Sequence, residues 1–133
     1  MRFKNIALAS VILAAFVFAG CGKTKPIVTI EGAPVITQSE KATMKKVEKA
    51  IISAGITRGW QMKPTKPGHI IATLNLRQHM AMVDITYDTK AYNIRYKDSG
   101  PTMLYDGTNI HRQYNNWVVN LDRSIRAALS QIQ

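Results

Sequence analysis

Three consecutive runs of residues alternate between apolar and polar side chains, and this pattern constrains the fold more than any other feature of the sequence. The runs are His69–Leu76, His79–Tyr87 and Ala91–Lys97. Alternation with a period of two is typical of strands that bury one face and expose the other. Because the connections are only two or three residues long, consecutive strands pair antiparallel. A further strand is predicted over Arg58–Lys63, with Trp60 and Met62 on one side.

The last part of the chain has the period of an amphipathic helix. Its apolar residues recur at helical spacing and form one continuous stripe. They are Ile110, Tyr114, Trp117, Val118, Leu121, Ile125, Ala128 and Leu129. Asp106, Thr108 or Asn109 is expected to cap this helix. Two adjacent asparagines, Asn115 and Asn116, are poor helix formers, so we expect them to bond a loop or to face a partner.

A first helix is predicted over residues 38–54, ahead of the strands. Thr37 and Glu40 have the spacing of a capping box, and Gly55 is placed to end the helix. The lysines of this segment form either an anion-binding face or an ordinary solvated surface. The element order is then helix, four strands, helix. It predicts one α+β domain over residues 37–133, with both helices on one face of a four-stranded antiparallel sheet.

The N-terminal 20 residues have the features of a secretory signal. Arg2 and Lys4 supply the positive charge, and residues 6–20 carry no charge. A run of roughly 15 residues is short for a membrane-spanning helix, which needs about 20. We therefore expect residues 1–20 to be removed.

The segment Phe18-Ala19-Gly20-Cys21 resembles the lipobox of bacterial lipoproteins. The resemblance implies cleavage before Cys21, acylation of this residue with chains such as palmitate, and a stable membrane anchor. Gly22 stands where an Asp would favour retention at the inner membrane, so the periplasmic face of the outer membrane is expected. The alternative is an ordinary secreted protein with one free thiol.

Residues 21–36 are expected to be the acylated cysteine and a tether. Pro26, Gly32 and Pro34 punctuate this segment without a period, although Ile27, Val28 and Ile30 could form a short edge strand. Fully extended, 15 residues reach roughly 50 Å, which would let the domain stand away from the membrane.

The chain is basic, and export limits what this charge can bind. It has 18 Lys and Arg against 8 Asp and Glu, and an excess of eight persists without Arg2 and Lys4. A nucleic-acid partner is not expected outside the cytoplasm. The expected anions are lipid head groups, lipopolysaccharide phosphates and acidic protein surfaces.

A candidate binding face combines basic, aromatic and amide side chains from several predicted elements. Its residues are Arg58, Lys66, Arg77, Arg95, Tyr92, Arg112 and Asn116. Arginine and tyrosine are frequent at protein interfaces. The alternatives are solubilising charge scattered over the surface, and aromatic residues used in a small core.

The sequence predicts neither a cofactor nor a metal site, and it predicts no enzymatic activity. Nucleophile elbows, zinc-protease motifs and Gly-rich phosphate loops are absent. His69, His79 and His111 lack metal-ligand spacing, and a site from His69, His79 and an Asp would need those two histidines to meet. An enzyme with residues spread over loops is the remaining alternative.

Several motifs of the domain together resemble a family of small proteobacterial lipoproteins with no established activity. They are Gly59-Trp60, Pro67-Gly68-His69-Ile70, Leu76-Arg77-Gln78-His79, Val83-Asp84-Ile85-Thr86-Tyr87, Tyr92-Asn93-Ile94, Tyr105-Asp106-Gly107, Ile110-His111 and Tyr114-Asn115-Asn116-Trp117. The resemblance covers most of the domain and implies a compact exported protein. The expected function is a membrane-tethered accessory module that binds an envelope protein; the alternative is a module for lipid head groups or lipopolysaccharide phosphates.

Overall fold

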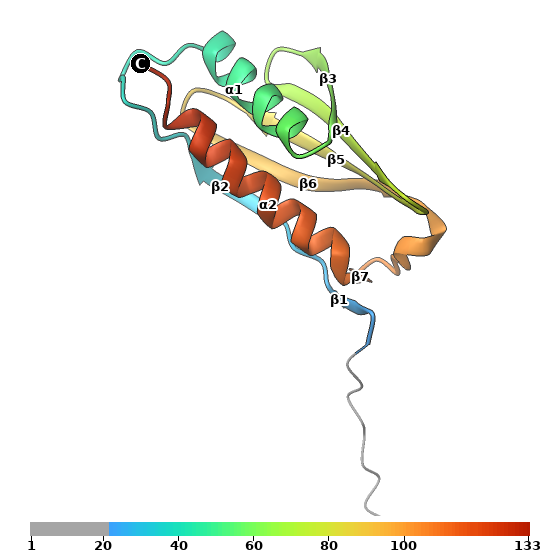
Figure 1. Cartoon of the computed structure of the whole chain (residues 1–133). Coiled ribbons are helices and arrows are strands. Elements are labelled where there is room, and N and C mark those ends of the chain that lie inside the picture. Colours follow the sequence, from blue (N-terminus) through green and yellow to red (C-terminus); the bar gives the residue numbers. More distant parts are fainter. Residues whose placement is uncertain (1–21) are drawn as a thin grey trace, which may run out of the picture.

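A computed structural model describes residues 22–133, which form a layer of helices on a main antiparallel sheet, with a small second sheet beside it (Figure 1). The expected signal segment and Cys21 lie outside the described residues. In chain order the elements are β1 (Thr24–Pro26), β2 (Ile30–Pro34), α1 (Met44–Thr57), β3 (Gln61–Lys66), β4 (His69–Leu76), β5 (His79–Tyr87), β6 (Ala91–Ser99), the 3-10 turn η1 (Pro101–Met103), β7 (Asn109–His111) and α2 (Arg112–Leu129). None of the helices in this part of the chain has the length and apolar character needed to cross a bilayer.

The predicted four-stranded sheet is wrong, although the class is α+β with two helices. The main sheet has five strands in the order β2-β6-β5-β4-β3, and β1 and β7 form a second sheet of two strands. The added strand β2 pairs with β6, where Ile30 opposes Ile94 and Ala33 opposes Tyr92. Ala33 is buried there, so the edge of β6 is covered by a segment that the sequence predicts to be a tether.

Both helices lie on the same face of the main sheet, and the core fills the space between the layers (Figure 1). The sheet contributes alternate residues such as Ile70, Val83 and Ile94, all fully buried. From α2 the buried side chains recur every three or four residues; they are Tyr114, Val118, Leu121, Ile125 and Leu129. The opposite face of the sheet carries polar side chains and has no described element over it.

Helix α1 begins six residues later than predicted and ends beyond Gly55. Thr43 caps its first turn by accepting from the N–H of Lys46 at 3.2 Å, whereas Thr37 bonds locally to the Ser39 carbonyl. Gly55 lies inside the helix, where a Cβ would overlap the Met62 sulfur. The Met62 side chain therefore packs directly against the backbone of α1 at Gly55, and a larger residue there would displace it.

The ends of α2 and β3 also differ from the prediction. His111, rather than Asp106, Thr108 or Asn109, caps α2 by accepting from the Gln113 N–H. Asp106 instead accepts from the N–H groups of Thr108 and Asn109, so its side chain holds the preceding turn. Strand β3 starts at Gln61, three residues after the predicted start.

Candidate functional site

The N-terminal strap, which we define as residues 23–35, is bonded to the domain along its length. The Lys23 carbonyl accepts from the Arg112 N–H at 2.8 Å, and the Ile27 N–H donates to the Thr108 carbonyl at 2.9 Å. Farther along, the Val35 N–H donates to the Lys90 carbonyl at 2.8 Å. The segment predicted to be a flexible tether thus forms two strands and their connection.

Asn115 clamps the middle of the strap to α2. Its Oδ1 accepts from the Val28 N–H at 2.9 Å, and its Nδ2 donates to the Pro26 carbonyl at 2.9 Å. This contact explains one of the two mid-helix asparagines, because an amide can satisfy a backbone donor and a backbone acceptor together. The adjacent Asn116 is exposed and borders a neighbouring hollow with Trp117 and Arg123.

A pocket of about 480 Å³ lies at the end of the domain where the strap docks, and we call it the histidine pocket. It forms between the β4–β5 turn and the first turns of α2. Its lining residues are Leu76, Arg77, Gln78, His79, His111, Gln113 and Trp117. The rings of His79 and His111 are 4.9 Å apart between centroids, and the rings of His79 and Trp117 are 6.1 Å apart.

Hydrogen bonds assign the neutral tautomer of His79. The Thr102 hydroxyl donates to the Gln78 carbonyl at 2.9 Å and lies 2.8 Å from His79 Nδ1. Since a hydroxyl has one proton, both bonds form together only when His79 Nδ1 carries a proton and donates it. Nε2 of neutral His79 then has a free lone pair.

His111 has the opposite tautomer because it caps α2. Its Nδ1 accepts from the Gln113 N–H at 3.2 Å, so the proton of the neutral ring is on Nε2. Burial is the main cause that lowers the pKa of His111, and the nearby charges of Arg112 and Lys23 lower this pKa further. The pocket therefore combines an Nε2–H donor on His111 with an Nε2 acceptor on His79.

Arg77 brings a permanent positive charge to the same pocket. It lies in the two-residue turn between β4 and β5 with φ of 56°, a backbone conformation that costs a non-glycine residue energy. Arg77 lines the pocket together with its neighbour Leu76 and with Trp117 of α2. An arginine, two histidines and an indole can together hold an anion attached to a flat or apolar group.

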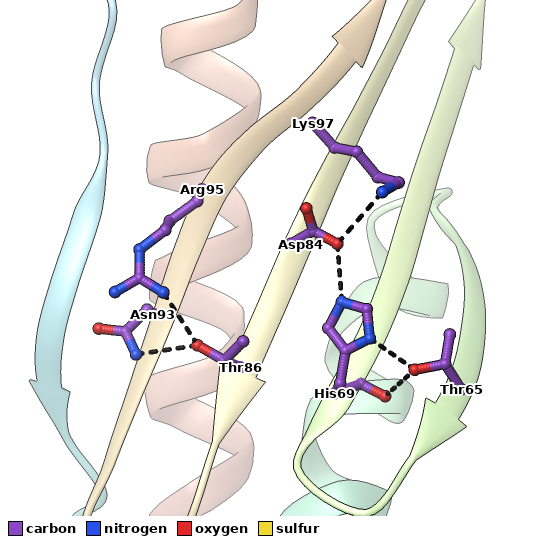
Figure 2. Close-up of polar contacts among 7 residues, drawn as sticks. All are labelled: Thr65, His69, Asp84, Thr86, Asn93, Arg95 and Lys97. Atoms are coloured by element: carbon purple, nitrogen blue, oxygen red, sulfur yellow. Dashed lines mark hydrogen bonds and ion pairs between the residues drawn. The ribbon is translucent and has the colours of Figure 1, made fainter.

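The open face of the main sheet carries a second group of polar residues, centred on Asp84 (Figure 2). His69 Nε2 lies 2.7 Å from Asp84 Oδ1, and its Nδ1 lies 2.5 Å from the Thr65 hydroxyl. Lys97 Nζ is 3.8 Å from the same carboxylate oxygen. Hydroxyl, imidazole and carboxylate therefore follow one another as in a hydrolase relay, but none of these side chains lines the histidine pocket.

Arg95 lies on the same open face and is already paired. Its Nε and Nη2 donate to the two carboxylate oxygens of Glu31, each at 2.7 Å. Figure 2 shows its guanidinium also reaching Thr86, whose hydroxyl accepts from Asn93 at 2.9 Å. This two-point ion pair lowers the pKa of Glu31. It also uses the two N–H donors with which Arg95 would otherwise bind a phosphate.

The structure does not bring the predicted binding face together. Tyr92 is fully buried beneath the helices and donates to Asp122 at 2.5 Å, and burial together with this carboxylate raises its pKa. Arg58 bonds the Ser124 hydroxyl on the helix side at 2.6 Å, and Lys66 is exposed at the end of β3. Of the predicted residues, Arg77 lines the histidine pocket, Arg112 bonds Lys23 of the strap, and Asn116 borders the neighbouring hollow.

The same topology separates two of the histidines considered for a metal site. In the β4–β5 hairpin His69 opposes Thr86, whereas His79 opposes Leu76, so the two rings are at opposite ends of the sheet. Among residues 22–133 no three His, Cys, Asp or Glu side chains cluster as metal ligands would. The pair that does meet is His79 and His111.

Comparison with known proteins finds no family model, no curated protein and no solved structure that matches this chain.

Proposed function

We propose that the chain is a lipid-anchored binding module of the cell envelope whose histidine pocket holds a phosphate-bearing ligand. The observation that carries the proposal is the pocket itself, where Arg77 and two histidines of opposite tautomer converge. The proposed location is the periplasmic face of the outer membrane, with Cys21 as the acylated anchor. The proposed role is binding rather than catalysis.

The chemistry of the pocket favours a phosphate monoester over a carboxylate or a neutral sugar. The Arg77 guanidinium and the His111 Nε2–H can each donate to a phosphate oxygen. His79 Nε2 can accept from a protonated phosphate oxygen or from a hydroxyl of the attached group. Trp117 offers an aromatic face to that group, so a sugar phosphate fits both halves of the pocket.

The other basic residues are less suited to hold an anion. Arg95 is committed to Glu31, and Lys97 is near Asp84. Arg77 and Arg112 form no ion pair with another residue of the 22–133 region. Arg77 is therefore the cationic side chain of the histidine pocket that is free to hold an anion.

The experiment is a titration of the protein with glucose 1-phosphate and, separately, with glucose. The readout is the imidazole resonances of the three histidines, with His69 on the open face as an internal control. We expect the sugar phosphate to shift the signals of His79 and His111 but not those of His69. The affinity should fall as ionic strength rises, because salt screens the charge attraction.

Matched variants make this test sharper. Arg77→Gln should weaken binding by about tenfold or more, since a hydrogen bond to a charged group contributes about 1.5–3 kcal/mol. His111→Asn keeps a capping acceptor but loses the Nε2–H, so it should weaken binding with the fold intact. Arg95→Gln, on the open face, is the control for lost charge. Equal shifts from glucose and its phosphate, or equal effects of Arg77→Gln and Arg95→Gln, would contradict the proposal.

Docking of an envelope protein is the second proposed function, and the uncovered face of the main sheet favours it. Thr73 and Asp84 lie on this face, and no described element packs over it. A photo-crosslinking residue at Thr73 should then yield one defined protein adduct in living cells, while the same residue at Lys49 on α1 should not. If both positions give the same set of adducts, the sheet face is not a specific docking site.

A further inference from the structure

We propose that the strap end of the domain lies directly on an anionic lipid surface, namely the bilayer that holds Cys21. We define the strap end as residues 22–25, 76–79 and 101–112. This inference rests on the lipid anchor of the proposed function and adds the orientation of the domain. In this orientation the histidine pocket is surrounded by the lipid head groups of that leaflet.

The length of free chain is the first observation. Only Gly22 separates Cys21 from Lys23, whose carbonyl is bonded to the Arg112 N–H at the start of α2. Two residues span at most about 7 Å. An acylated Cys21 therefore keeps the start of α2 within a short distance of the membrane, whereas a 15-residue tether would have allowed roughly 50 Å.

Exposed apolar side chains gather at the same end. The large hydrophobic residues exposed in the described chain are Ile36, Ile56, Leu76, Leu104 and Tyr105. Leu76 is 48% exposed, Leu104 51% and Tyr105 39%, and all three belong to the strap end. Leucine and tyrosine are side chains that enter the interfacial region of a bilayer readily.

Backbone strain marks the same two loops. Within residues 22–133 the only non-glycine residues with positive φ are Arg77, at 56°, and Leu104, at 54°. Both are exposed, and both follow an element that ends at the strap end. Because such conformations cost energy and are retained where a function uses them, an exposed leucine in this conformation indicates a contact outside the domain.

The charge of the strap end complements anionic head groups. Lys23, Lys25, Arg77 and Arg112 are exposed there, against Asp106, whose Oδ1 already accepts two backbone N–H groups. Basic residues near an anionic membrane each add about 1 kcal/mol of attraction. The opposite end also has lysines, so the charge alone does not select an end; the anchor and the apolar residues do.

Hydrogen bonds and a ring contact show that these loops lie beside one another. The Thr102 hydroxyl bonds Gln78 and His79, and the ring of His79 is 4.9 Å from that of His111. His111 is paired in turn with Thr24 of the strap. Figure 1 shows β1, near the start of the described chain, beside β7 and the first turn of α2.

The test uses the full chain, expressed with its N-terminal segment and extracted after processing in the cell. Spin labels are attached at Leu104→Cys or, as a matched control at the opposite end, at Ile36→Cys. Ile36 is 65% exposed, so both labels start in water. The protein is reconstituted on vesicles of phosphatidylglycerol and phosphatidylcholine, and relaxation by a water-soluble nickel complex is compared with relaxation by oxygen.

We expect the label at position 104 to lose several-fold in nickel accessibility on the vesicles and to gain in oxygen accessibility, while the label at 36 keeps its values. Lys25→Glu with Arg112→Glu should reverse much of this protection, whereas Lys66→Glu with Lys90→Glu should not. Labels that stay equally accessible on protein that floats with the vesicles would overturn the orientation and leave the anchor intact. Protein that neither floats nor carries acyl mass at Cys21 would overturn the anchor, and the orientation with it.

Discussion

Replacing Asn115 with alanine is the perturbation that most directly tests how the strap is held. The side chain makes two hydrogen bonds to the strap, at Val28 and at Pro26, each 2.9 Å long. Each bond of this kind contributes about 0.5–1.5 kcal/mol. Alanine is also the better helix former by about 0.6 kcal/mol, which offsets part of the loss. The expected net destabilisation of the docked strap is about 0.4–2.4 kcal/mol.

Asn116→Ala is the matched control, because Asn116 is the next residue of the same helix and is exposed. It receives the same gain in helix propensity and gives up no bond to the strap. The difference between the two variants therefore isolates the clamp, and we expect it to be about 1–3 kcal/mol. Asn116→Ala itself should be slightly more stable than the parent.

Native-state hydrogen exchange measures this difference where it arises. The amides of Val28, Ile27 and Arg112 should exchange roughly 5-fold to 150-fold faster in Asn115→Ala than in Asn116→Ala, since 1.4 kcal/mol is a factor of ten. The Val35 amide, bonded to Lys90 at the other end of the strap, should change less. Equal exchange at Val28 in the two variants would refute the clamp, and acceleration that is uniform over the strap would refute its local action.

Three further predictions follow from the same geometry. The pKa of His111 is lowered in the folded state, so the unfolded chain binds more protons at a pH between this lowered pKa and the ordinary value near 6.5. The folded state should therefore lose stability as the pH falls below about 6.5. Denaturant titrations from pH 7 to 5 should show that His111→Asn reduces this pH dependence. Tyr92→Phe removes the donor to Asp122 and should lower the free energy of unfolding by about 1.5–3 kcal/mol, as measured by urea unfolding; an unchanged midpoint would show that water satisfies the carboxylate. Gly68→Ala should destabilise the protein more than Gly107→Ala. Both glycines have positive φ, but only a Cβ at position 68 would meet a backbone oxygen, that of Tyr87, at 3.0 Å. Equal melting temperatures of the two variants would contradict this contact.

The two central strands can be predicted residue for residue, because their alternation is continuous and their connection is short. β4 and β5 occupy the predicted ranges. The strap is predicted as a tether with at most one short edge strand, and its two pairings are not predicted, for the opposite reason. Its strands are three and five residues long and contain Gly32 and Pro34, and its partner β6 lies about 60 residues farther along the chain. Local sequence carries little information on such a distant pairing.

The residues of the predicted binding face are divided between the two sides of the sheet, for a reason that the alternation already contains. Tyr92 and Arg95 are three residues apart on β6, so their side chains point to opposite sides of the sheet. Tyr92 is in the core, and Arg95 is on the open face. The period of two is therefore enough by itself to place these two side chains on different faces.

The histidine pocket cannot be predicted in this way, because it depends on three segments that meet only through the topology. His79 starts β5, His111 ends β7 and Trp117 lies in α2. The one local signal is that each histidine flanks an element boundary, where a ring can serve as a cap or a turn partner. Nothing in the sequence places those two boundaries at one end of the sheet.

The pairing of the strap with the last elements has a consequence for the order of events in the export that we propose. A chain that crosses the membrane from its N-terminus presents Cys21 early, but Arg112 and Asn115, which hold the strap, arrive last. Until then the segment is unbound and can extend to roughly 50 Å. The long-range contacts of the strap form late because they close the largest loops. When α2 docks, the strap becomes bonded to the domain, and the domain is then held close to the proposed anchor at Cys21. Completion of folding is then also the step that brings the protein to the surface on which we propose it works.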